Sequence, residues 1–404
     1  MKRRVILAYS GGLDTSVILK WLIEQGFDVV CYMADLGQEE DFEAAKRKAL
    51  SIGATSVYIE DLQREFVEDF IFPSLSAHAV YEGKYLLGTA LARPLIAKKL
   101  VEAAQKEGIS SFAHGATGKG NDQVRFELTI LKHLPHARII APWRDPEFLA
   151  QFTGRSDLLH YAEMHQIPVT STKEKPYSMD ENLMHTSYES GELEDPACCP
   201  KEAMFLRTAS PQSAPDKEMK ISIEFQGGNP IAIDELESGK KVTGSVALFK
   251  YLNSIGGVHG IGRMDFVESR FVGMKIRGIY ETPAGTILLK AHLDLEGITL
   301  DREVFLLKEC FAPKIAQIIY NGFWFSPEME FLMAAISQSQ RRVTGKVFVT
   351  LYKGNVLITG RTSPYSLYHG GLASMETTGG YDQTDATGFI KLNALRLMTG
   401  SGNE

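Results

Sequence analysis

The sequence predicts an α/β fold with a doubly wound parallel sheet, followed by an α+β domain and a C-terminal tail. Three observations lead to this prediction. Within residues 1–170, short apolar runs alternate with segments of helical periodicity. Two glycine-rich turns, at residues 10–12 and 115–120, each follow a predicted strand directly. Beyond residue 170 the regular alternation stops, and strands and helices are expected in mixed order.

The N-terminal alternation defines individual elements. We expect strands at residues 4–9, 27–33, 56–59, 110–113 and 138–141, and helices at residues 14–25, 41–51, 91–107 and from about residue 121. Strands separated by helices form βαβ units and a parallel sheet covered on both faces. Ligands of such sheets bind beyond the carboxyl ends of the strands, where both glycine turns are expected to lie.

The second half of the chain has a different character. Residues 171–218 are rich in Pro, Ser, Lys and Glu, and we expect a long excursion between domains there. Strands are expected at residues 221–225, 285–290 and 346–359, a helix at 326–341, and an amphipathic stretch at 389–397. The predicted domains are therefore residues 1–170, 171–361 and 362–404.

Composition excludes several classes of protein. A chain of 404 residues is too long for one compact core, which favours more than one domain. The net charge of −7 argues against a nucleic-acid partner, and the absence of an apolar run of ~20 residues argues against a membrane partner. Four cysteines without a CxxC pair are typical of reduced thiols, so a cytoplasmic location is expected.

The first glycine turn has the features of an anion site. Gly11 and Gly12 let backbone N–H groups point inward, and the following helix start adds partial positive charge. Ser10, Thr15 and Ser16 supply hydroxyl donors. Neither the lysine of GxxxxGK[ST] nor the GxGxxG pattern is present, so the turn is neither a Walker loop nor a dinucleotide fingerprint. A plain strand–helix turn is the alternative interpretation.

The second glycine turn leads into a segment with both charges. Asn121 and Arg125 are four residues apart and therefore share a helix face, and Asp122 lies beside them. A carboxylate can bind an ammonium group, while a guanidinium and an amide can bind carboxylates, so the segment suits a zwitterion. A solvated Asp122–Arg125 ion pair is the alternative interpretation.

Two other features have less specific interpretations. His160 and His165 are five residues apart, so they diverge too far around a helix for the HExxH zinc motif. The Met and aromatic residues of 323–331 are more typical of a core or a subunit interface than of a cofactor site.

Four segments carry a resemblance to the argininosuccinate synthase family. They are AYSGGLDTS at residues 8–16, GATGKGNDQVR at 115–125, SMDEN at 178–182 and GIYETP at 278–283. The similarity extends from Val5 to about Leu397. It implies a pyrophosphate loop that cuts ATP between its α and β phosphates, and a ligase that joins citrulline and aspartate through a citrullyl-AMP intermediate. It also implies a homotetramer, with the tail as an oligomerisation segment.

The resemblance assigns site residues by position. The ATP residues would be Ala8, Tyr9, Ser10, Gly11, Gly12, Leu13, Asp14, Thr15, Ser16, Ala34 and Gly115. The aspartate residues would be Thr117, Asn121 and Asp122. The citrulline residues would be Tyr85, Asn121, Arg125, Ser178, Ser187, Glu268 and Tyr280. Mg²⁺ is expected with the ATP phosphates, and no protein-bound metal is expected. No residue is singled out as the general base.

These assignments agree with the chemistry. A ureido oxygen is a poor nucleophile, so it must be positioned against the α-phosphorus, and Arg125 and Glu268 can hold the two charged groups of citrulline. Ala90 departs from the family, because many members carry a serine there that touches citrulline. One neutral hydrogen bond contributes about 1 kcal/mol, and Thr89 or water could supply it.

Two rival functions have recognisable signatures. A tRNA thiolase with the same loop would need an activated cysteine pair and a basic surface, and the sequence has neither. A non-catalytic adenine-nucleotide sensor would leave the charged second segment and the second domain without a role. Pyrophosphate release that depends on both amino acids separates these three possibilities.

Overall fold

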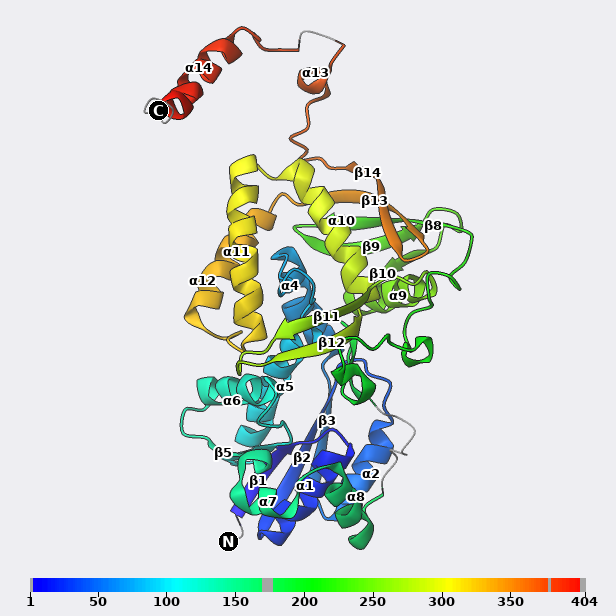
Figure 1. Cartoon of the computed structure of the whole chain (residues 1–404), viewed down its shortest axis with the longest axis vertical. Coiled ribbons are helices and arrows are strands. Elements are labelled where there is room, and N and C mark those ends of the chain that lie inside the picture. The colour runs from blue at the N-terminus through cyan, green and yellow to red at the C-terminus, as the bar shows by residue number, and fades with distance from the viewer. Residues whose placement is uncertain (1–2, 169–176, 377–378, 400–404) are drawn as a thin grey trace.

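The computed structural model describes residues 3–168, 177–376 and 379–399. An α/β unit that contains the N-terminus lies at one end of the elongated molecule, a second unit lies above it, and a tail extends from the far end (Figure 1). In these described ranges, no helix combines the length and apolar character needed to cross a membrane.

The N-terminal unit is built on a five-stranded parallel sheet in the order β3-β2-β1-β4-β5. The strands are β1 (Arg3–Ala8), β2 (Phe27–Asp35), β3 (Ser56–Asp61), β4 (Ser111–His114) and β5 (Arg138–Ile140). Ala8 at the end of β1 is paired with Tyr32 of β2 on one side and with His114 of β4 on the other. The carboxyl ends of β1 and β4 therefore lie side by side.

Helices cover both faces of this sheet, which confirms the doubly wound fold. They are α1 (Leu13–Glu24), α2 (Phe42–Ile52), α5 (Gly88–Lys106), α6 (Asp122–His133), η2 (Pro142–Arg144), α7 (Pro146–Gln151) and α8 (Arg155–Met164). Val5 and Leu7 of β1 pack in one cluster with residues of α1, α2, α7 and α8. Ile6, between them, packs in another cluster with residues of α5 and α6, because successive strand residues point to opposite faces.

The connection from β3 to α5 leaves the N-terminal unit and returns to it. It contains α3 (Gln63–Glu65), the π-helical turn η1 (Phe66–Ile71) and α4 (Phe72–Ser76), none of which the sequence analysis predicted. Phe70 and Leu75 belong to the same buried cluster as Ile223, Leu288 and Ile319 of the second unit. The two units therefore share a hydrophobic core.

The second unit contains two antiparallel sheets. One has the order β10-β9-β8-β13-β14, and the other has the order β11-β12-β7-β6. The strands are β6 (Ser178–Glu181), β7 (Thr186–Glu189), β8 (Met219–Gln226), β9 (Asn229–Glu235), β10 (Lys241–Thr243), β11 (Arg263–Ser269), β12 (Lys275–Glu281), β13 (Gly345–Tyr352) and β14 (Asn355–Thr362). The expected excursion at 171–218 thus contributes β6 and β7 to a sheet. The predicted boundary at 170/171 lies outside the described residues.

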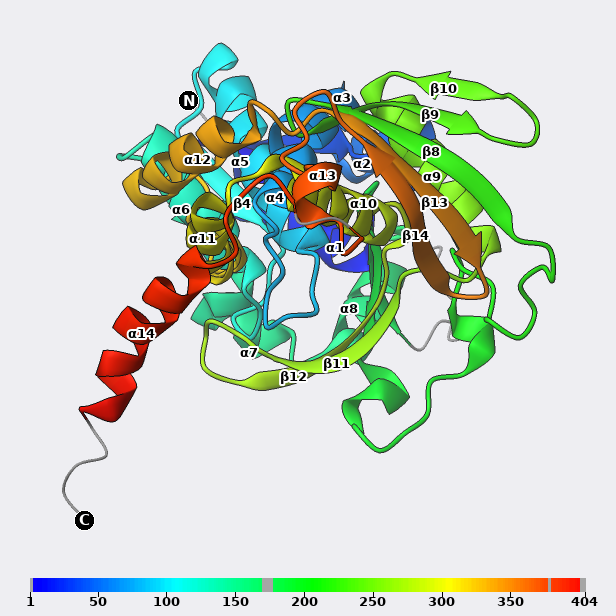
Figure 2. The same ribbon diagram turned by 90° about the horizontal axis from the view of Figure 1, so that it is seen from above.

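The helices of this unit pack around the sheets (Figure 2). They are η3 (Gly191–Glu194), η4 (Glu202–Met204), α9 (Ser245–Val258), α10 (Pro283–Thr299), α11 (Arg302–Tyr320) and α12 (Pro327–Gln340). The predicted strand at 285–290 is wrong, because these residues lie within α10. Its buried residues Ala284, Ile287, Leu288, Ala291 and Leu295 follow helical spacing, which six residues are too few to reveal.

The aromatic segment 323–331 packs partly on the core. Phe323, Trp324 and Phe325 lie against the shared core, and Trp324 stacks on Phe70 with ring centroids 4.7 Å apart. Met329 is buried, whereas Phe331 is 72% exposed.

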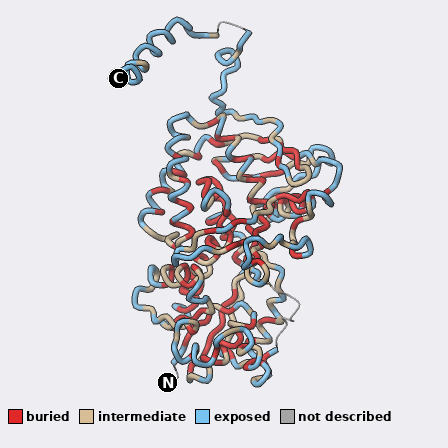
Figure 3. Tube along the Cα trace, viewed as in Figure 1, coloured by how far each residue is buried: buried red, intermediate tan, exposed pale blue. Residues whose placement is uncertain are grey.

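The tail holds α13 (Gly370–Ala373) and α14 (Asp385–Met398). The tail begins against the second unit, where Leu367 N donates to the carbonyl of Ile298 at 2.7 Å, and α14 lies away from the rest of the chain. The described part of the tail is almost entirely exposed (Figure 3). Six large apolar side chains of α14 are more than half exposed: Phe389, Ile390, Leu392, Leu395, Leu397 and Met398.

Candidate active site

The first glycine turn joins the end of β1 to the start of α1. Gly11 has a φ of +72°, in the left-handed region that favours glycine. Gly12 occupies the N-cap position of α1, and no side chain caps the helix there. The first N–H groups of α1 therefore have no side-chain cap, which leaves the helix start suited to an anion.

Hydroxyl groups hold the shape of this turn. Ser10 Oγ lies 3.1 Å from Thr15 Oγ1, and Ser16 Oγ donates to the carbonyl of Gly12 at 2.7 Å. Lys48 Nζ on α2 donates to the carbonyl of Gly11 at 2.9 Å. Burial lowers the pKa of Lys48, and nearby Glu40 opposes this effect. Lys48 places a cation beside the turn, and no sequence motif had identified it.

The second glycine turn lies directly against the first. A methyl group added to Gly115 would be 3.0 Å from Thr15 Cγ2, so the two turns are in van der Waals contact. Ala34 lies near the carboxyl end of β2, which is the neighbour of β1 on the other side. The residues assigned to ATP therefore gather at the carboxyl ends of β1, β2 and β4.

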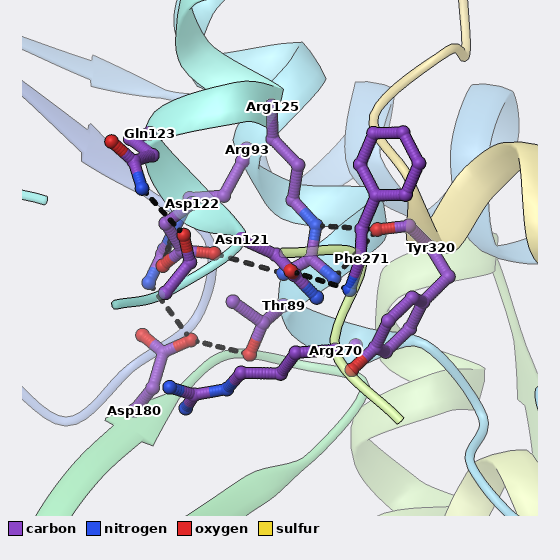
Figure 4. A network of polar contacts seen from close by, with 12 residues as sticks. Thr89, Arg93, Asn121, Asp122, Gln123, Arg125, Asp180, Arg270, Phe271 and Tyr320 are labelled. Atoms are coloured by element: carbon purple, nitrogen blue, oxygen red, sulfur yellow. Dashed lines mark hydrogen bonds and ion pairs between the residues drawn. The ribbon is translucent and has the colours of Figure 1, made fainter. Parts of the chain in front are cut away.

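Helix α6 presents the charged residues of the second segment (Figure 4). Asp122, its first residue, accepts hydrogen bonds from Arg93 Nε and Arg125 Nη1, each at 2.9 Å. Arg93 Nη2 also lies 3.1 Å from Asp180 Oδ2. Carboxylates and guanidinium groups thus alternate along a chain that joins α5, α6 and β6.

The electrostatics of Asp122 follow from these contacts. Burial alone would raise its pKa, but the guanidinium groups of Arg93 and Arg125 outweigh burial and hold the pKa below its usual range. Asp122 is therefore a carboxylate at neutral pH.

Arg125 and Asn121 connect α6 to the second unit. Arg125 Nε and Nη2 donate to the carbonyl of Tyr320 at 3.0 and 2.8 Å. The guanidinium carbon lies 5.0 Å from the centre of the Tyr320 ring. Asn121 Oδ1 accepts from the backbone N–H of Phe271 at 3.0 Å. This side of the candidate site is consequently built across both units.

Glu268 is the acidic centre of an aromatic cluster. Its carboxylate accepts from the hydroxyls of Tyr280 at 2.9 Å and Tyr320 at 2.8 Å, and Tyr85 stacks on Tyr280 with centroids 4.5 Å apart. Burial raises the pKa of Glu268, while the two phenol donors and Arg125 lower it in part. The structure thus brings Glu268, Tyr280 and Tyr85 together.

The three remaining candidates lie around this core. Ser187 of β7 is paired with Tyr280 of β12, and its hydroxyl donates to the carbonyl of Asp180 at 3.3 Å. Ser178 is exposed and begins β6, the edge strand of that sheet. Thr117 lies in the second turn, where its carbonyl accepts from Gly120 N at 3.2 Å.

Four residues of this network were not predicted from the sequence: Arg93, Asp180, His185 and Thr89, whose bonds to Asp180 and His185 appear only in the fold. Thr89 Oγ1 donates to Asp180 Oδ2 at 2.7 Å and lies 3.0 Å from His185 Nε2. Asp180 belongs to the quoted segment 178–182, but neither Asp180 nor Arg93 has a charge partner that the sequence alone reveals. Burial lowers the pKa of His185 to about 3, so this imidazole is neutral.

Ala90 stands where many members of the family carry a serine. Ala90 is wholly buried within the shared core. The neighbouring Thr89 hydroxyl already bonds to Asp180 and His185, so any hydrogen bond it makes to a substrate must be shared with these groups.

The site combines an uncapped helix start, which suits an anion, with paired charges that suit amino acids, at one edge of a parallel sheet. Residues 4–168 match the family description "Arginosuccinate synthase N-terminal HUP domain", and residues 177–399 match "Arginosuccinate synthase C-terminal domain". The chain belongs to the argininosuccinate synthase family.

Curated relatives match the chain over nearly its full length. The argininosuccinate synthase of Thermotoga sp. strain RQ2 is 59% identical over 397 residues, which cover 98% of this chain and 97% of the relative. Those of Xenopus laevis and Mus musculus are each 55% identical over 396 residues, which cover 98% of this chain and 96% of the relative.

Proposed function

We propose that the chain joins citrulline and aspartate to form argininosuccinate, with ATP cleaved to AMP and pyrophosphate by way of citrullyl-AMP. Family membership over nearly the full chain supports this ligation, which belongs to arginine biosynthesis. One observation of the structure carries the proposal. The two glycine turns touch at Gly115 and Thr15, and the second leads directly into the charged start of α6. Phosphate and amino-acid groups can therefore meet at one sheet edge.

The first turn holds the phosphates of ATP. Its backbone N–H groups, the uncapped start of α1 and the hydroxyls of Ser10 and Thr15 would bind the pyrophosphate that leaves, while the buried Ser16 hydroxyl holds the carbonyl of Gly12. Ala34 and Gly115 border the nucleotide at the neighbouring strand ends. Mg²⁺ enters with the nucleotide and neutralises part of its phosphate charge.

Citrulline binds across the two units. The Arg125 guanidinium holds its carboxylate, and the Glu268 carboxylate holds its ammonium group, while Tyr85 and Tyr280 pack along its side chain. Asn121, Ser178 and Ser187 complete the polar contacts. Because both ends of the amino acid are fixed, the ureido oxygen is placed for in-line attack on the α-phosphorus.

Aspartate binds beside α6, with its charged groups on Thr117, Asn121 and Asp122. The Asp122 carboxylate, which is ionised at neutral pH, attracts the ammonium group of the incoming substrate. After adenylation the former ureido oxygen is a good leaving group, and the deprotonated aspartate amine displaces AMP from the ureido carbon.

A product analysis tests the proposed function. The purified chain is incubated with ATP, citrulline and aspartate, and with each amino acid omitted in turn. We expect AMP, pyrophosphate and argininosuccinate in equal amounts when all three substrates are present. ADP with orthophosphate, or nucleotide cleavage that ignores both amino acids, would contradict the assignment.

We also propose a cytoplasmic homotetramer with three divisions: residues 1–170 for ATP, 171–361 for the amino acids and 362–404 for assembly. The exposed apolar side chains of α14 support the role in assembly, because an isolated helix of this kind gains stability by packing on a partner. Light scattering on the intact chain measures the assembly state.

A further inference from the structure

A cluster of potential metal ligands lies in the second unit, within the shared core and apart from the candidate active site. His78 follows α4, and His292 and Glu296 are four residues apart on α10, so they share a helix face. One donor atom from each of the three lies within 4.8 Å of the others. His78 is 8% exposed, His292 2% and Glu296 0%.

The separations in this cluster match those of ligands on a single ion. His78 Nε2 lies 3.1 Å from His292 Nδ1 and 3.3 Å from Glu296 Oε2, and His292 Nδ1 lies 3.7 Å from Glu296 Oε1. Two ligands that are each about 2.0–2.1 Å from a tetrahedral Zn²⁺ lie about 3.4 Å apart. Each carboxylate oxygen faces a different histidine nitrogen.

The surrounding hydrogen bonds fix the tautomer of His292. Gln340 Nε2 donates to Glu296 Oε1 at 2.6 Å, because a carboxylate only accepts, and this contact sets the orientation of the amide. Gln340 Oε1 then faces His292 Nε2 at 2.9 Å, so His292 Nε2 must carry the hydrogen. The lone pair of His292 is consequently on Nδ1, which faces His78.

His78 is oriented in the same way. Its Nδ1 lies 3.2 Å from the Glu309 carboxylate and therefore carries a hydrogen. In these tautomers the lone pairs of His78 Nε2 and His292 Nδ1 face each other and the Glu296 carboxylate, so the three side chains converge as ligands of one cation do.

We propose that His78, His292 and Glu296 bind a divalent transition-metal ion of the Zn²⁺ class. Two imidazole nitrogens with a carboxylate form a ligand set typical of Zn²⁺. Each ligand has the outer partner that metal sites generally use: Glu309 for His78, Gln340 for His292, and Lys308 at 2.8 Å for Glu296. The sequence analysis expected no protein-bound metal, because these ligands come together only in the fold.

The ion would join parts of the chain that are far apart in sequence. His78 ends the segment that inserts α4 into the second unit, whereas His292 and Glu296 belong to α10. The connection from β3 to α5 then continues past His78 to Tyr85, a candidate citrulline residue. Metal binding is therefore expected to stabilise the folded chain rather than to take part in the ligation.

The Lys308 ammonium group competes with a metal ion for the Glu296 carboxylate. This group bonds Glu296 Oε2 and reduces the negative charge of the cluster. Lys308 bonds only Oε2 of the carboxylate, so the two histidine nitrogens that face the cluster remain available to a cation.

Metal analysis of the intact chain tests the proposal. The chain is stripped with a chelator, dialysed against micromolar Zn²⁺ and analysed by elemental mass spectrometry. We expect about one ion per chain, a higher midpoint of thermal unfolding, and tetrahedral visible absorption when Co²⁺ replaces Zn²⁺. His78→Asn should lose the ion and the absorption, because asparagine tolerates the backbone at φ 50° but the imidazole is gone.

Two further variants separate the loss of a ligand from a general loss of stability. Glu309→Gln changes a carboxylate that is 46% exposed, and should weaken Zn²⁺ binding about 10- to 100-fold with the fold retained. His259→Asn, at a buried histidine outside the cluster, should bind as the unmodified chain does. A wild-type chain that binds less than one-tenth of an equivalent, or equal binding by wild type, His78→Asn and Glu309→Gln, would overturn the proposal.

Discussion

Asp122 and Arg125 lie one turn apart on α6, and we predict that their replacement impairs different halves of the reaction. Arg125→Gln removes the proposed partner of the citrulline carboxylate, which is needed before adenylation. Asp122→Asn removes the proposed partner of the aspartate ammonium, which is needed only afterwards. A hydrogen bond to a charged group contributes about 1.5–3 kcal/mol, which corresponds to roughly a 10- to 150-fold loss in the step that uses it.

The structure also predicts how strongly Asp122→Asn affects the citrulline step. Asp122 makes one of the three hydrogen bonds that orient Arg125, and the other two go to the carbonyl of Tyr320 at 3.0 and 2.8 Å. Asp122→Asn keeps an acceptor oxygen and leaves both bonds to Tyr320. The citrulline step should therefore lose about 1 kcal/mol at most, or roughly fivefold.

Positional isotope exchange in ATP, with citrulline present and aspartate absent, measures the first half-reaction alone. Exchange should persist within roughly fivefold in Asp122→Asn and fall roughly 10- to 150-fold in Arg125→Gln, whereas complete turnover should fall in both. Glu303→Gln, on the exposed start of α11, is the control for the loss of a carboxylate. Equal loss of exchange in two folded variants would refute separate roles and make α6 a single structural unit.

Three other predictions concern the turn, the acid response and the tail. Gly115→Ala should raise KM for ATP at least roughly fivefold, because the added methyl group would lie 3.0 Å from Thr15 Cγ2 and overpacking costs about 1 kcal/mol or more. Gly118→Ala is the control in the same steady-state assay, because its added methyl group would have its nearest contact at 3.5 Å. The folded pKa of Asp122 is lowered, so its stabilisation is complete above the unfolded pKa of about 4 and is lost as pH falls through the folded value. Urea unfolding below pH about 4 should therefore depend less steeply on pH in Asp122→Asn, and an unchanged slope would contradict the ion pairs. Leu392→Asp should reduce the mass measured by light scattering with the secondary structure retained; an unchanged mass would exclude α14 from assembly.

Local signals in the sequence were sufficient for the five strands of the N-terminal sheet and for α1, α2, α5 and α6, but not for α3, α4, α7 and α8. The apolar runs, the helical spacing after Gly12 and the glycines that follow the first two helices, Gly26 and Gly53, are contained in windows of a dozen residues. Chain direction then places the ends of β1 and β4 at one edge, because parallel strands connected by helices share their polarity. Residues 285–290 show the limit of this reasoning: the apolar segment was assigned to a strand, and only the full length of α10 shows the helical period.

The sequence by itself predicted an anion-binding turn and a charged segment suited to a zwitterion, since each depends on residues that are neighbours along the chain, and the family resemblance of four segments indicated the class of reaction. Only the tertiary structure decided which charges meet. Arg93 reaches Asp122 and Asp180, Arg125 reaches the carbonyl of Tyr320, and His78 reaches α10, over separations of up to 214 residues. Such contacts depend on how α4 and α5 pass between the two units, and at Asp122 the two guanidinium groups then lower the pKa against the opposing effect of burial.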